Sequence, residues 1–409
     1  MRLRIKEICD YVSRGTTPDY VDEGANKVMN QATFSKGWLD ESNIRYTSKA
    51  NKGARIMKGD LLMASTGGGV LGKVFFFDDD DSFYADSHVT IMRNSKGANL
   101  MKYLYYYFYL RYEEINATMV KGSTNQTELQ RNYLLSYELD VPTLADQQRM
   151  ITYLDTKLSE IDHQVSILTS KRDAYLRLKK SIINHAVTRG LDPNVKMKDS
   201  GIEWIGEVPE HWEVKRMKEL SAIGSGTTPK SGEDKYYENG IHPWLNTSDV
   251  QDCVINEAKF SITDKALNDY SVLKYYPIGT ILIAMYGGGT IGNVALMNIS
   301  ATINQACCAI VSNEKLLLPK YLFSYLKCYK KKIISLGFGG TQVNLSQAII
   351  AQLPVALPPL PEQHAIATYL DDKCSKIDTI VSNLDKQISR YGDLKRSLID
   401  EVITGKRAV

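Results

Sequence analysis

The sequence lacks the features that mark several common protein classes. No run of about 18 apolar residues occurs, so no membrane-spanning helix is expected. Met1-Arg-Leu-Arg-Ile-Lys has no apolar core after its charges, so we expect no secretory signal peptide. The six cysteines form no Cys-x-x-Cys pair and no metal-ligand spacing with the six histidines. This pattern predicts a reduced, cytoplasmic protein without a metal site.

Motifs for catalysis are also missing. We find no Asn/Asp-Pro-Pro-aromatic stretch of an amino-methyltransferase, no glycine loop for S-adenosylmethionine, and no Ser/His/Asp or Cys/His constellation. Residues 67–73 fit the phosphate-loop pattern G-x-x-x-x-G-K, but Val74 stands where that loop needs Ser or Thr to hold Mg²⁺. We therefore interpret residues 67–73 as a tight turn between two strands, and we expect a non-catalytic chain.

The chain is long enough for more than one domain, and its charge is close to balanced. It has 409 residues, of which 43% are hydrophobic, and a formal net charge of +3. A small positive charge permits binding to nucleic acid but does not by itself indicate it.

One long stretch occurs twice. In the first copy Pro142-Thr-Leu-Ala-Asp-Gln leads into Thr152-Tyr-Leu-Asp, and in the second Pro358-Pro-Leu-Pro-Glu-Gln leads into Thr368-Tyr-Leu-Asp. The offset of 216 positions then holds to Thr404 in the second copy. A repeat of this size outranks any single motif as a guide to the architecture.

Both copies predict long helices that pair with each other. Apolar residues recur at alternating steps of three and four, which is the pattern of a left-handed coiled coil. The two apolar seams can bury one another in an antiparallel pair. The seam positions are Ile151, Leu154, Leu158, Ile161, Val165, Leu168, Tyr175 and Ile182 in the first copy, and Leu370, Cys374, Ile377, Val381, Leu384, Ile388, Tyr391, Leu398 and Val402 in the second.

The segments before the two helices repeat as well. Gly226-Thr-Thr-Pro matches Gly15-Thr-Thr-Pro, and the glycine loop at 287–292 matches the one at 67–72. We therefore predict an α+β fold with two similar globular α/β domains separated by a pair of long antiparallel coiled-coil helices. The expected order is a first domain at 1–143, a long helix at 144–190, a second domain at 191–357 and a second long helix at 358–409.

Local patterns in the first domain give two further expectations. Residues 2–8 alternate apolar and charged side chains and predict a strand, while the tyrosine-rich residues 102–112 predict a helix.

The loops shared by the two halves are small and polar, and cations accompany them. Asn, Gln, Arg, Lys, Ser and Thr are the side chains that hydrogen-bond base edges and phosphates. Polar loops are also common on ordinary protein surfaces, so the loops alone are a weak indication. The repeat favours binding to nucleic acid, because two similar scaffolds with divergent loops suit two separate readings of one long ligand. The candidate DNA contacts are Arg14, Thr16, Thr17, Ser65, Thr66, Lys73, His88, Lys121, Ser123, Asn125 and Gln126 in the first half, and Thr227, Thr228, Lys230, Asn246, Tyr286, Asn293, Asn304, Gln305, Thr341, Gln342 and Asn344 in the second.

The repeated motif resembles a known family. Two similar domains, each followed by Pro-x-x-Glu/Asp-Gln-x₄-Thr-Tyr-Leu-Asp-x-Lys-x₃-Ile-Asp, resemble the specificity subunit of a type I restriction–modification system. Residues 190–214 resemble the lead into the second target-recognition domain of that family. The resemblance covers nearly the whole chain. Two departures are that the first domain lacks the Trp-containing lead-in, and that Ala145-Asp replaces Pro361-Glu.

The resemblance implies a function and a set of partners. Each domain would read one half of a split, asymmetric site in double-stranded DNA, and the helices would set the gap and dock two modification subunits that methylate adenine. Restriction/translocase subunits would join this core, and S-adenosylmethionine, ATP and Mg²⁺ are expected in the partner subunits rather than in this chain. The expected docking residues are Gln147, Tyr153, Asp155, Gln363, Tyr369 and Asp371. The rival hypothesis is a coiled-coil adaptor with two ligand-binding domains and no DNA role.

Overall fold

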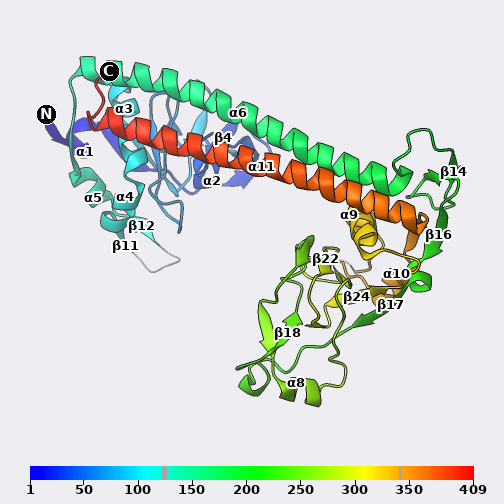
Figure 1. Ribbon diagram of the computed structural model, residues 1–409. Coiled ribbons are helices and arrows are strands. Elements are labelled where there is room, and N and C mark those ends of the chain that lie inside the picture. The colour runs from blue at the N-terminus through cyan, green and yellow to red at the C-terminus, as the bar shows by residue number, and fades with distance from the viewer. Residues whose placement is uncertain (122–126, 340–342) are drawn as a thin grey trace. The chain divides into compact units, whose positions relative to one another are not determined.

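The protein consists of two units that share two long helices. Its structure, a computed structural model, describes residues 1–121, 127–339 and 343–409. One unit comprises Met1–Thr169 and Lys386–Val409, and the other comprises Ser170–Asp385. Each unit contains one α/β domain and a part of each long helix (Figure 1). The predicted fold class is therefore confirmed.

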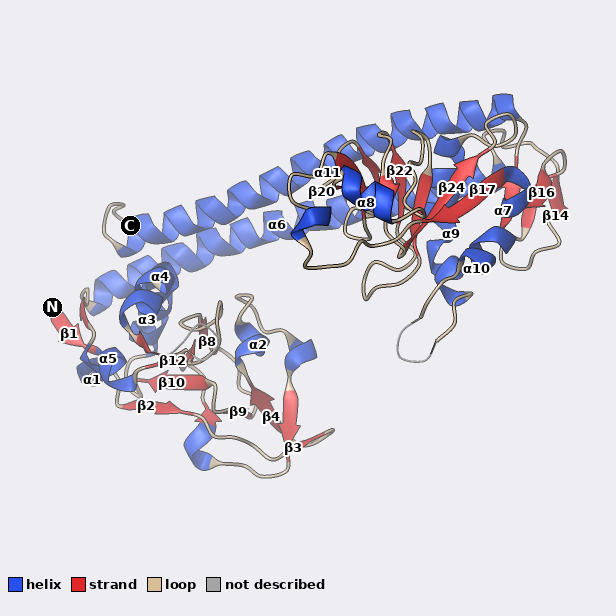
Figure 2. Ribbon diagram, turned by 90° about the horizontal axis from the view of Figure 1, so that it is seen from below, coloured by secondary structure: helices blue, strands red, loops and turns tan. Residues whose placement is uncertain are grey.

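The first unit has a helical layer and two main sheets (Figure 2). One sheet has the order β2-β10-β7-β8 and the other has the order β3-β5-β4-β9-β6. The strands are β1 (Arg2–Arg4), β2 (Tyr11–Arg14), β3 (Tyr20–Val21), β4 (Asn26–Met29), β5 (Arg45–Thr47), β6 (Arg55–Ile56), β7 (Leu61–Ala64), β8 (Val74–Phe76), β9 (Phe83–Ala85), β10 (Val89–Arg93), β11 (Val120–Lys121), β12 (Glu128–Leu129) and β13 (Glu138–Asp140). The helices of its domain are α1 (Ile5–Ile8), α2 (Gln31–Phe34), α3 (Ala98–Leu110), α4 (Tyr112–Thr118) and α5 (Arg131–Ser136).

Strand β7 shows why these layers form. All four of its residues are buried, and successive side chains of a strand point to opposite faces of the sheet. Leu61 and Met63 belong to the apolar core that contains α3, whereas Leu62 and Ala64 belong to the core that contains residues of the second sheet. The continuous apolar run therefore places this strand between two layers.

The second unit repeats the arrangement. Its main sheet has the order β17-β24-β21-β22-β19, and a smaller sheet has the order β20-β18-β23. Ile281 and Ile283 face the core shared with α9, and Leu282 faces the opposite core. The strands are β14 (Met197–Asp199), β15 (Glu207–Pro209), β16 (Glu213–Arg216), β17 (Ser221–Ser225), β18 (His242–Leu245), β19 (Cys253–Ile255), β20 (Phe260–Ile262), β21 (Ile281–Ala284), β22 (Val294–Met297), β23 (Thr302–Ile303), β24 (Cys307–Ser312) and β25 (Pro354–Leu357), and the helices are α7 (Met217–Leu220), α8 (Asp264–Asp269), α9 (Pro319–Ser335) and α10 (Gln347–Gln352).

The two predicted long helices are present as α6 (Leu144–Arg189), with 46 residues, and α11 (Leu360–Ile403), with 44 residues. In the first unit the start of α6 packs against the end of α11, because Leu154 and Leu158 lie in one core with Leu398 and Val402. In the second unit the end of α6 shares a core with the start of α11. The helices therefore pair antiparallel within each unit, through the predicted apolar seam.

Two ion pairs show that the helix pairing is internally symmetric. In the first unit Lys395 Nζ lies 2.8 Å from the carboxylate of Asp162. In the second unit Lys179 Nζ lies 2.6 Å from the carboxylate of Asp378. Adding the 216-residue offset to Asp162 and Lys179 gives Asp378 and Lys395. The same pair therefore occurs twice, with the two helices exchanging the acidic and basic roles.

One local expectation is wrong, and a second is refined. The predicted strand over residues 2–8 ends at Arg4, and residues 5–8 form helix α1. The carboxylate of Glu7 accepts a hydrogen bond from the backbone N–H of Arg4 at 2.8 Å and so caps the helix. Ile5 and Ile8, three positions apart, are both buried. The tyrosine-rich helix runs from Ala98 to Leu110, so it begins and ends earlier than predicted.

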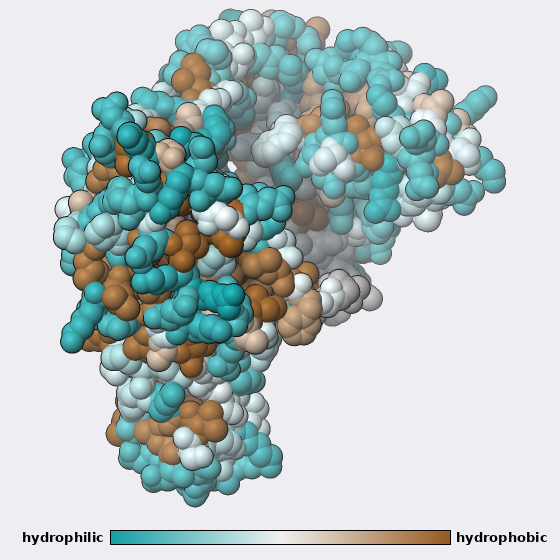
Figure 3. Space-filling view, turned by 90° about the vertical axis from the view of Figure 1, so that its right-hand side faces the viewer, coloured by the Kyte–Doolittle hydropathy of each residue, from teal (hydrophilic) through white to brown (hydrophobic). Residues whose placement is uncertain are grey.

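Across the residues that the structure describes, no helix is both long and apolar enough to cross a membrane. The same residues include no group of three His, Cys, Asp or Glu side chains placed to hold a metal ion. On the face shown in Figure 3, apolar side chains form separate patches between hydrophilic ones.

Candidate functional site

In each domain, three polar loops meet at one end of the main sheet. Strand β10 runs antiparallel to both of its neighbours, with Thr90 opposite Arg14 of β2 and Val89 opposite Ala64 of β7. The ends of β2 and β7 therefore lie beside the start of β10. We call residues 14–17, 65–72 and 86–88 the first loop cluster. Strand β24 lies in the same way between β17 and β21, and we call residues 225–230, 285–293 and 304–306 the second loop cluster.

Charged groups hold the first loop cluster together. The guanidinium of Arg14 donates to the backbone carbonyl of Ser87 at 2.9 Å through Nε and forms an ion pair with Glu128 of β12. The Thr66 hydroxyl hydrogen-bonds Nδ1 of the exposed His88 at 2.7 Å. Buried Asp86 accepts the backbone N–H of His88 at 2.8 Å, and burial raises the pKa of its carboxyl group.

Neutral groups hold the second loop cluster together. The Thr228 hydroxyl donates to Oε1 of Gln305 at 2.5 Å. The Ser225 hydroxyl donates to the backbone carbonyls of Gln305 and Cys307 at 3.3 and 3.0 Å. The indole of Trp244 donates to the carbonyl of Thr227 at 3.2 Å. The two clusters therefore share a backbone frame but differ in chemistry.

One glycine in each loop cluster allows two of its loops to approach each other closely. A Cβ atom at Gly15 would lie 2.1 Å from the carbonyl oxygen of Ala85, and a Cβ at Gly226 would lie 1.7 Å from that of Ile303. Both distances are far below any contact that a side chain tolerates, so the repeated Gly-Thr-Thr-Pro loops require glycine at their first position.

The glycine loops form tight turns, as the sequence predicts. Gly67, Gly69 and Gly72 have φ of +90°, +82° and +84°, and the loop connects the antiparallel strands β7 and β8. The cation that follows is directed into its own domain, since Lys73 Nζ donates to the carbonyl of Ser35 at 2.9 Å. At the corresponding position, buried Asn293 donates to the carbonyl of Val250 at 2.9 Å.

Several other candidates have structural contacts. The Asn51 amide donates to Thr16 at 3.1 Å, and the hydroxyl of buried Ser65 pairs with that of Thr90. Asn246 accepts the N–H of Ser248 at 2.8 Å, and Asn304 accepts the N–H groups of Ala306 and Cys307 at 3.1 Å each. These side chains hold turns that shape the clusters.

The remaining candidates include three exposed residues, the half-buried Asn344, and residues outside the described ranges. Thr17, Lys121 and Lys230 are exposed, and Lys230 forms an ion pair with Glu233 at 2.7 Å. Asn344 is bridged to Phe338 next to the second loop cluster, since Leu345 donates its N–H to the carbonyl of Met285 at 2.7 Å. The candidates Ser123, Asn125, Gln126, Thr341 and Gln342 lie outside the described residues.

Four of the six expected docking residues join each long helix to its own domain. Asp155 pairs with Lys102 and Asp371 pairs with Lys320, each at 2.7 Å. Gln147 and Gln363 are buried, and each donates its amide to a backbone carbonyl five residues earlier at 2.9 Å. Gln363 also accepts the N–H of Leu318 at 2.7 Å. These contacts fix the start of each helix against the domain that precedes it.

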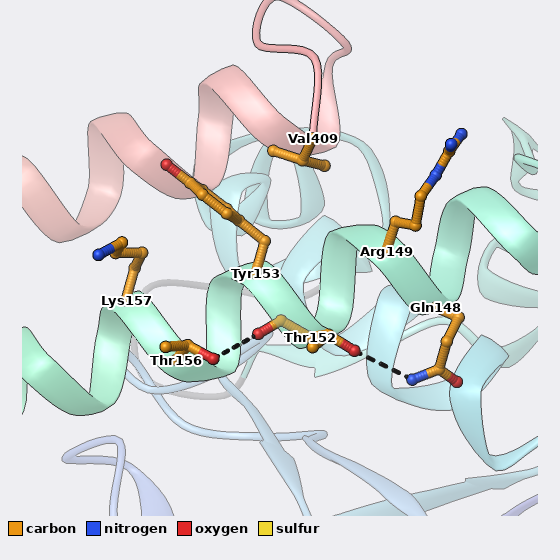
Figure 4. Close-up of a pocket in the computed structure, with 7 residues that line it drawn as sticks. All are labelled: Gln148, Arg149, Thr152, Tyr153, Thr156, Lys157 and Val409. Carbon is orange, nitrogen blue, oxygen red and sulfur yellow. Dashed lines mark hydrogen bonds between the residues drawn. The ribbon is translucent and has the colours of Figure 1, made fainter.

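The other two expected docking residues each line a groove. In the first unit, Tyr153 lies in an open groove of about 430 Å³ that is bordered by Arg149, Lys157 and Val409 (Figure 4). In the second unit, Tyr369 lies in an open groove of about 410 Å³ that is bordered by Pro193. Tyr153 and Tyr369 are 216 positions apart, and so are Pro193 and Val409. The repeat therefore places a tyrosine beside a residue that follows the other long helix once in each unit, although the other lining residues of the two grooves differ.

Comparisons with known proteins agree with this geometry. The sequence model described as the type I restriction modification DNA specificity domain matches residues 1–168 and 209–390. A putative type I restriction enzyme MjaX specificity subunit of Methanocaldococcus jannaschii is 23% identical over 414 residues, covering 98% of this chain and 92% of the relative. A putative type I restriction enzyme specificity subunit of Haemophilus influenzae is 23% identical over 373 residues, covering 89% and 88%. A solved chain from a study of complex assembly and conformational transition of the type I R-M system superposes with a TM-score of 0.73 at 15% identity, covering 98% of this chain and 97% of that one.

Proposed function

Because this chain belongs to the type I restriction–modification DNA specificity family, we propose that it is the DNA-specificity subunit of a type I restriction–modification complex. Each domain, a target-recognition domain, reads one half of a bipartite, asymmetric DNA site. The observation that carries the proposal is the pair of loop clusters, which present different side chains from equivalent ends of equivalent sheets. A shared frame with divergent polar side chains suits two separate readings of base edges.

The chain itself performs no chemistry in this proposal. It recruits two modification subunits, which methylate adenine with S-adenosylmethionine after flipping the base out of the helix. It also recruits restriction/translocase subunits, which use ATP and Mg²⁺. The exposed cation Lys121 lies beside the first loop cluster and the exposed cation Lys230 lies in the second. Both contact phosphates, a role that holds DNA without reading its sequence.

The two Tyr grooves receive the modification subunits in this proposal. Each groove combines a tyrosine from the start of one long helix with a residue that follows the end of the other, Val409 or Pro193. A feature that occurs twice under internal symmetry fits two copies of one partner. Tyrosine supplies a large apolar surface together with a hydrogen-bonding hydroxyl, which suits the centre of an interface.

Exchange of residues 191–357 for the second domain of a relative tests the proposed reading. We expect the second half-site alone to change, because the contacts that hold each loop cluster lie within one domain. Sequencing of methylated adenines in cells that carry the chimaera and its modification subunits measures both half-sites. A change in both half-sites would contradict independent reading.

Substitution of the groove tyrosines tests the docking sites. Tyr153→Ala or Tyr369→Ala should each weaken the binding of one modification subunit by roughly 30-fold or more, as expected for an interface residue worth about 2 kcal/mol. Native mass spectrometry should then show complexes with one modification subunit in place of two. Leu178→Ala and Leu394→Ala are matched controls, because both leucines are about half exposed, are 216 positions apart and lie outside the grooves. Normal stoichiometry in the double tyrosine variant would exclude the grooves.

A further inference from the structure

Gln305 is an exposed residue within a buried stretch. Residues 301–304 and 306–310 are all buried, whereas Gln305 is exposed in the turn that precedes β24. Its backbone is fixed on both sides, since Asn304 accepts the N–H groups of Ala306 and Cys307 at 3.1 Å each. The Ser225 hydroxyl donates to the Gln305 carbonyl at 3.3 Å. The second domain therefore presents this side chain from a hydrogen-bonded turn between β23 and β24.

A side chain from another loop of the second loop cluster holds the Gln305 amide. Oε1 accepts a hydrogen bond from the Thr228 hydroxyl at 2.5 Å. A primary amide has two N–H donors and two acceptor lone pairs. After this contact, Gln305 still has one acceptor lone pair and an N–H donor for a ligand.

That remaining pair complements one base edge. In the major groove, adenine offers N7 as an acceptor and N6–H as a donor, and a glutamine amide matches both at once. We propose that Gln305 reads one adenine of the second half-site through the major groove, with Thr228 as a positioning residue. This inference rests on the proposed function and adds the identity of a base to it.

The first domain provides an internal comparison. Its strand register places Ser87 where the second domain has Gln305, since Thr90 lies opposite Arg14 as Cys308 lies opposite Ser225. The carbonyl of Ser87 accepts the Arg14 guanidinium at 2.9 Å and 2.5 Å. The Arg14 guanidinium thus takes the place of the Ser225 hydroxyl, and Ser87 carries no amide. A glutamine contact to adenine is therefore expected in the second half-site only.

Holding the amide in advance has a thermodynamic reason. A free glutamine side chain loses rotamer freedom when it binds, and this cost reduces affinity. The hydrogen bond from Thr228 restricts the side chain before DNA arrives. Removal of the Thr228 hydroxyl should therefore weaken discrimination at the same base pair that Gln305 reads, and should leave the other positions of the site unchanged.

Base-by-base analysis of Gln305 variants tests the inference in the full complex with its modification subunits. For Gln305→Ser, which installs the first-domain residue, we expect the preference for adenine at one position of the second half-site to fall by about 10- to 100-fold. Gln305→Glu keeps the size but can only accept hydrogen bonds, so this variant should prefer cytosine at that position, through its N4–H donor. Methylated-adenine sequencing and competition binding with single-base variants of the site give both readouts.

Thr228→Val should reduce the preference at that same position without creating a new one. Gln352→Ser is the matched control, because Gln352 is also an exposed glutamine of the second domain but lies at the end of α10. An unchanged base preference in both Gln305 variants, or an equal loss of binding to all sequences, would overturn the adenine assignment. A wild-type complex that directs methylation to no bipartite site would instead overturn the proposed function.

Discussion

Arg93→Ala should lower the free energy of unfolding of the first domain by about 3–5 kcal/mol. Arg93 and Asp60 form a two-point ion pair, with Nε–Oδ1 and NH2–Oδ2 distances of 2.7 Å, and the Asp60 side chain is 0% exposed. Removal of the guanidinium leaves a buried carboxylate whose remaining partner is the N–H of Met57 at 2.7 Å. Denaturant unfolding monitored by circular dichroism measures the loss.

The pH dependence of this variant follows from the same burial. Burial raises the pKa of Asp60 in the folded protein, and Arg93 opposes this effect. Without Arg93 the folded pKa should rise further above the unfolded value of about 4. A carboxyl group with a raised folded pKa destabilises the fold at high pH and ceases to do so as it is protonated. The loss in free energy of unfolding caused by Arg93→Ala should therefore become smaller as the pH falls.

The second domain supplies a control for this prediction. Thr280 and Val311 occupy the positions of Asp60 and Arg93 in the second domain. Val311 has the place in β24 that Arg93 has in β10, and the N–H of Thr280 donates to Pro277 as the N–H of Asp60 donates to Met57. The Thr280 hydroxyl donates to the carbonyl of Pro277 at 2.7 Å, so no buried charge is present there. The double substitution Asp60→Thr with Arg93→Val should recover most of the lost stability. A double variant as unstable as Arg93→Ala would show that the unpaired charge is not the cause.

A fragment of residues 1–190 should form a homodimer. It keeps α6 but loses the α11 residues that complete the first core, Leu398, Ile399, Val402 and Ile403. Residues 182, 183, 186 and 187 of a second copy occupy the equivalent repeat positions and are Ile, Ile, Ala and Val. Asp162 can pair with Lys179 of the second copy, just as Asp162 pairs with Lys395 in the intact chain.

The expected consequence is a change in the symmetry of the DNA site. Each buried Leu, Ile or Val side chain contributes about 1.5–3 kcal/mol, so several exposed seam residues favour dimerisation strongly. Two identical domains related by a two-fold axis read an inverted repeat. With the modification subunits, the fragment should methylate a palindromic, interrupted form of the first half-site. Light scattering that shows a monomer, or methylation without inverted symmetry, would contradict this expectation.

The sequence predicts the architecture well because the long helices and the glycine turns each follow from a repeated residue pattern. The seam of Leu154, Leu158 and their equivalents follows from periodicity alone, since burial along a helix pair repeats at fixed steps. The glycine turns at 67–72 and 287–292 follow from the conformations that only glycine adopts readily. The alternating pattern of residues 2–8 predicts a strand and does not reveal helix α1. That helix is capped by a local hydrogen bond to Glu7, which the pattern does not show.

The site is less predictable because hydrogen bonds between distant loops determine it. Nothing in the order of residues shows that Glu128 reaches Arg14, or that Thr228 reaches Gln305. The sequence also does not separate Asn304, which holds a turn, from Gln305, which faces outward. One signal was present: Lys102 and Lys320 recur together with Asp155 and Asp371, and this joint repetition marks a contact between helix and domain.

The shared core of the first unit has a consequence for synthesis on the ribosome. The start of α6 packs against residues 398–403, which are made more than 200 residues after the end of α6 at Arg189. At about 5–20 residues per second, the seam of α6 remains unpaired for roughly 10–40 s. During that interval two nascent chains on one messenger can pair through α6, so the ratio of correct chains to entangled dimers should fall when ribosomes are closely spaced.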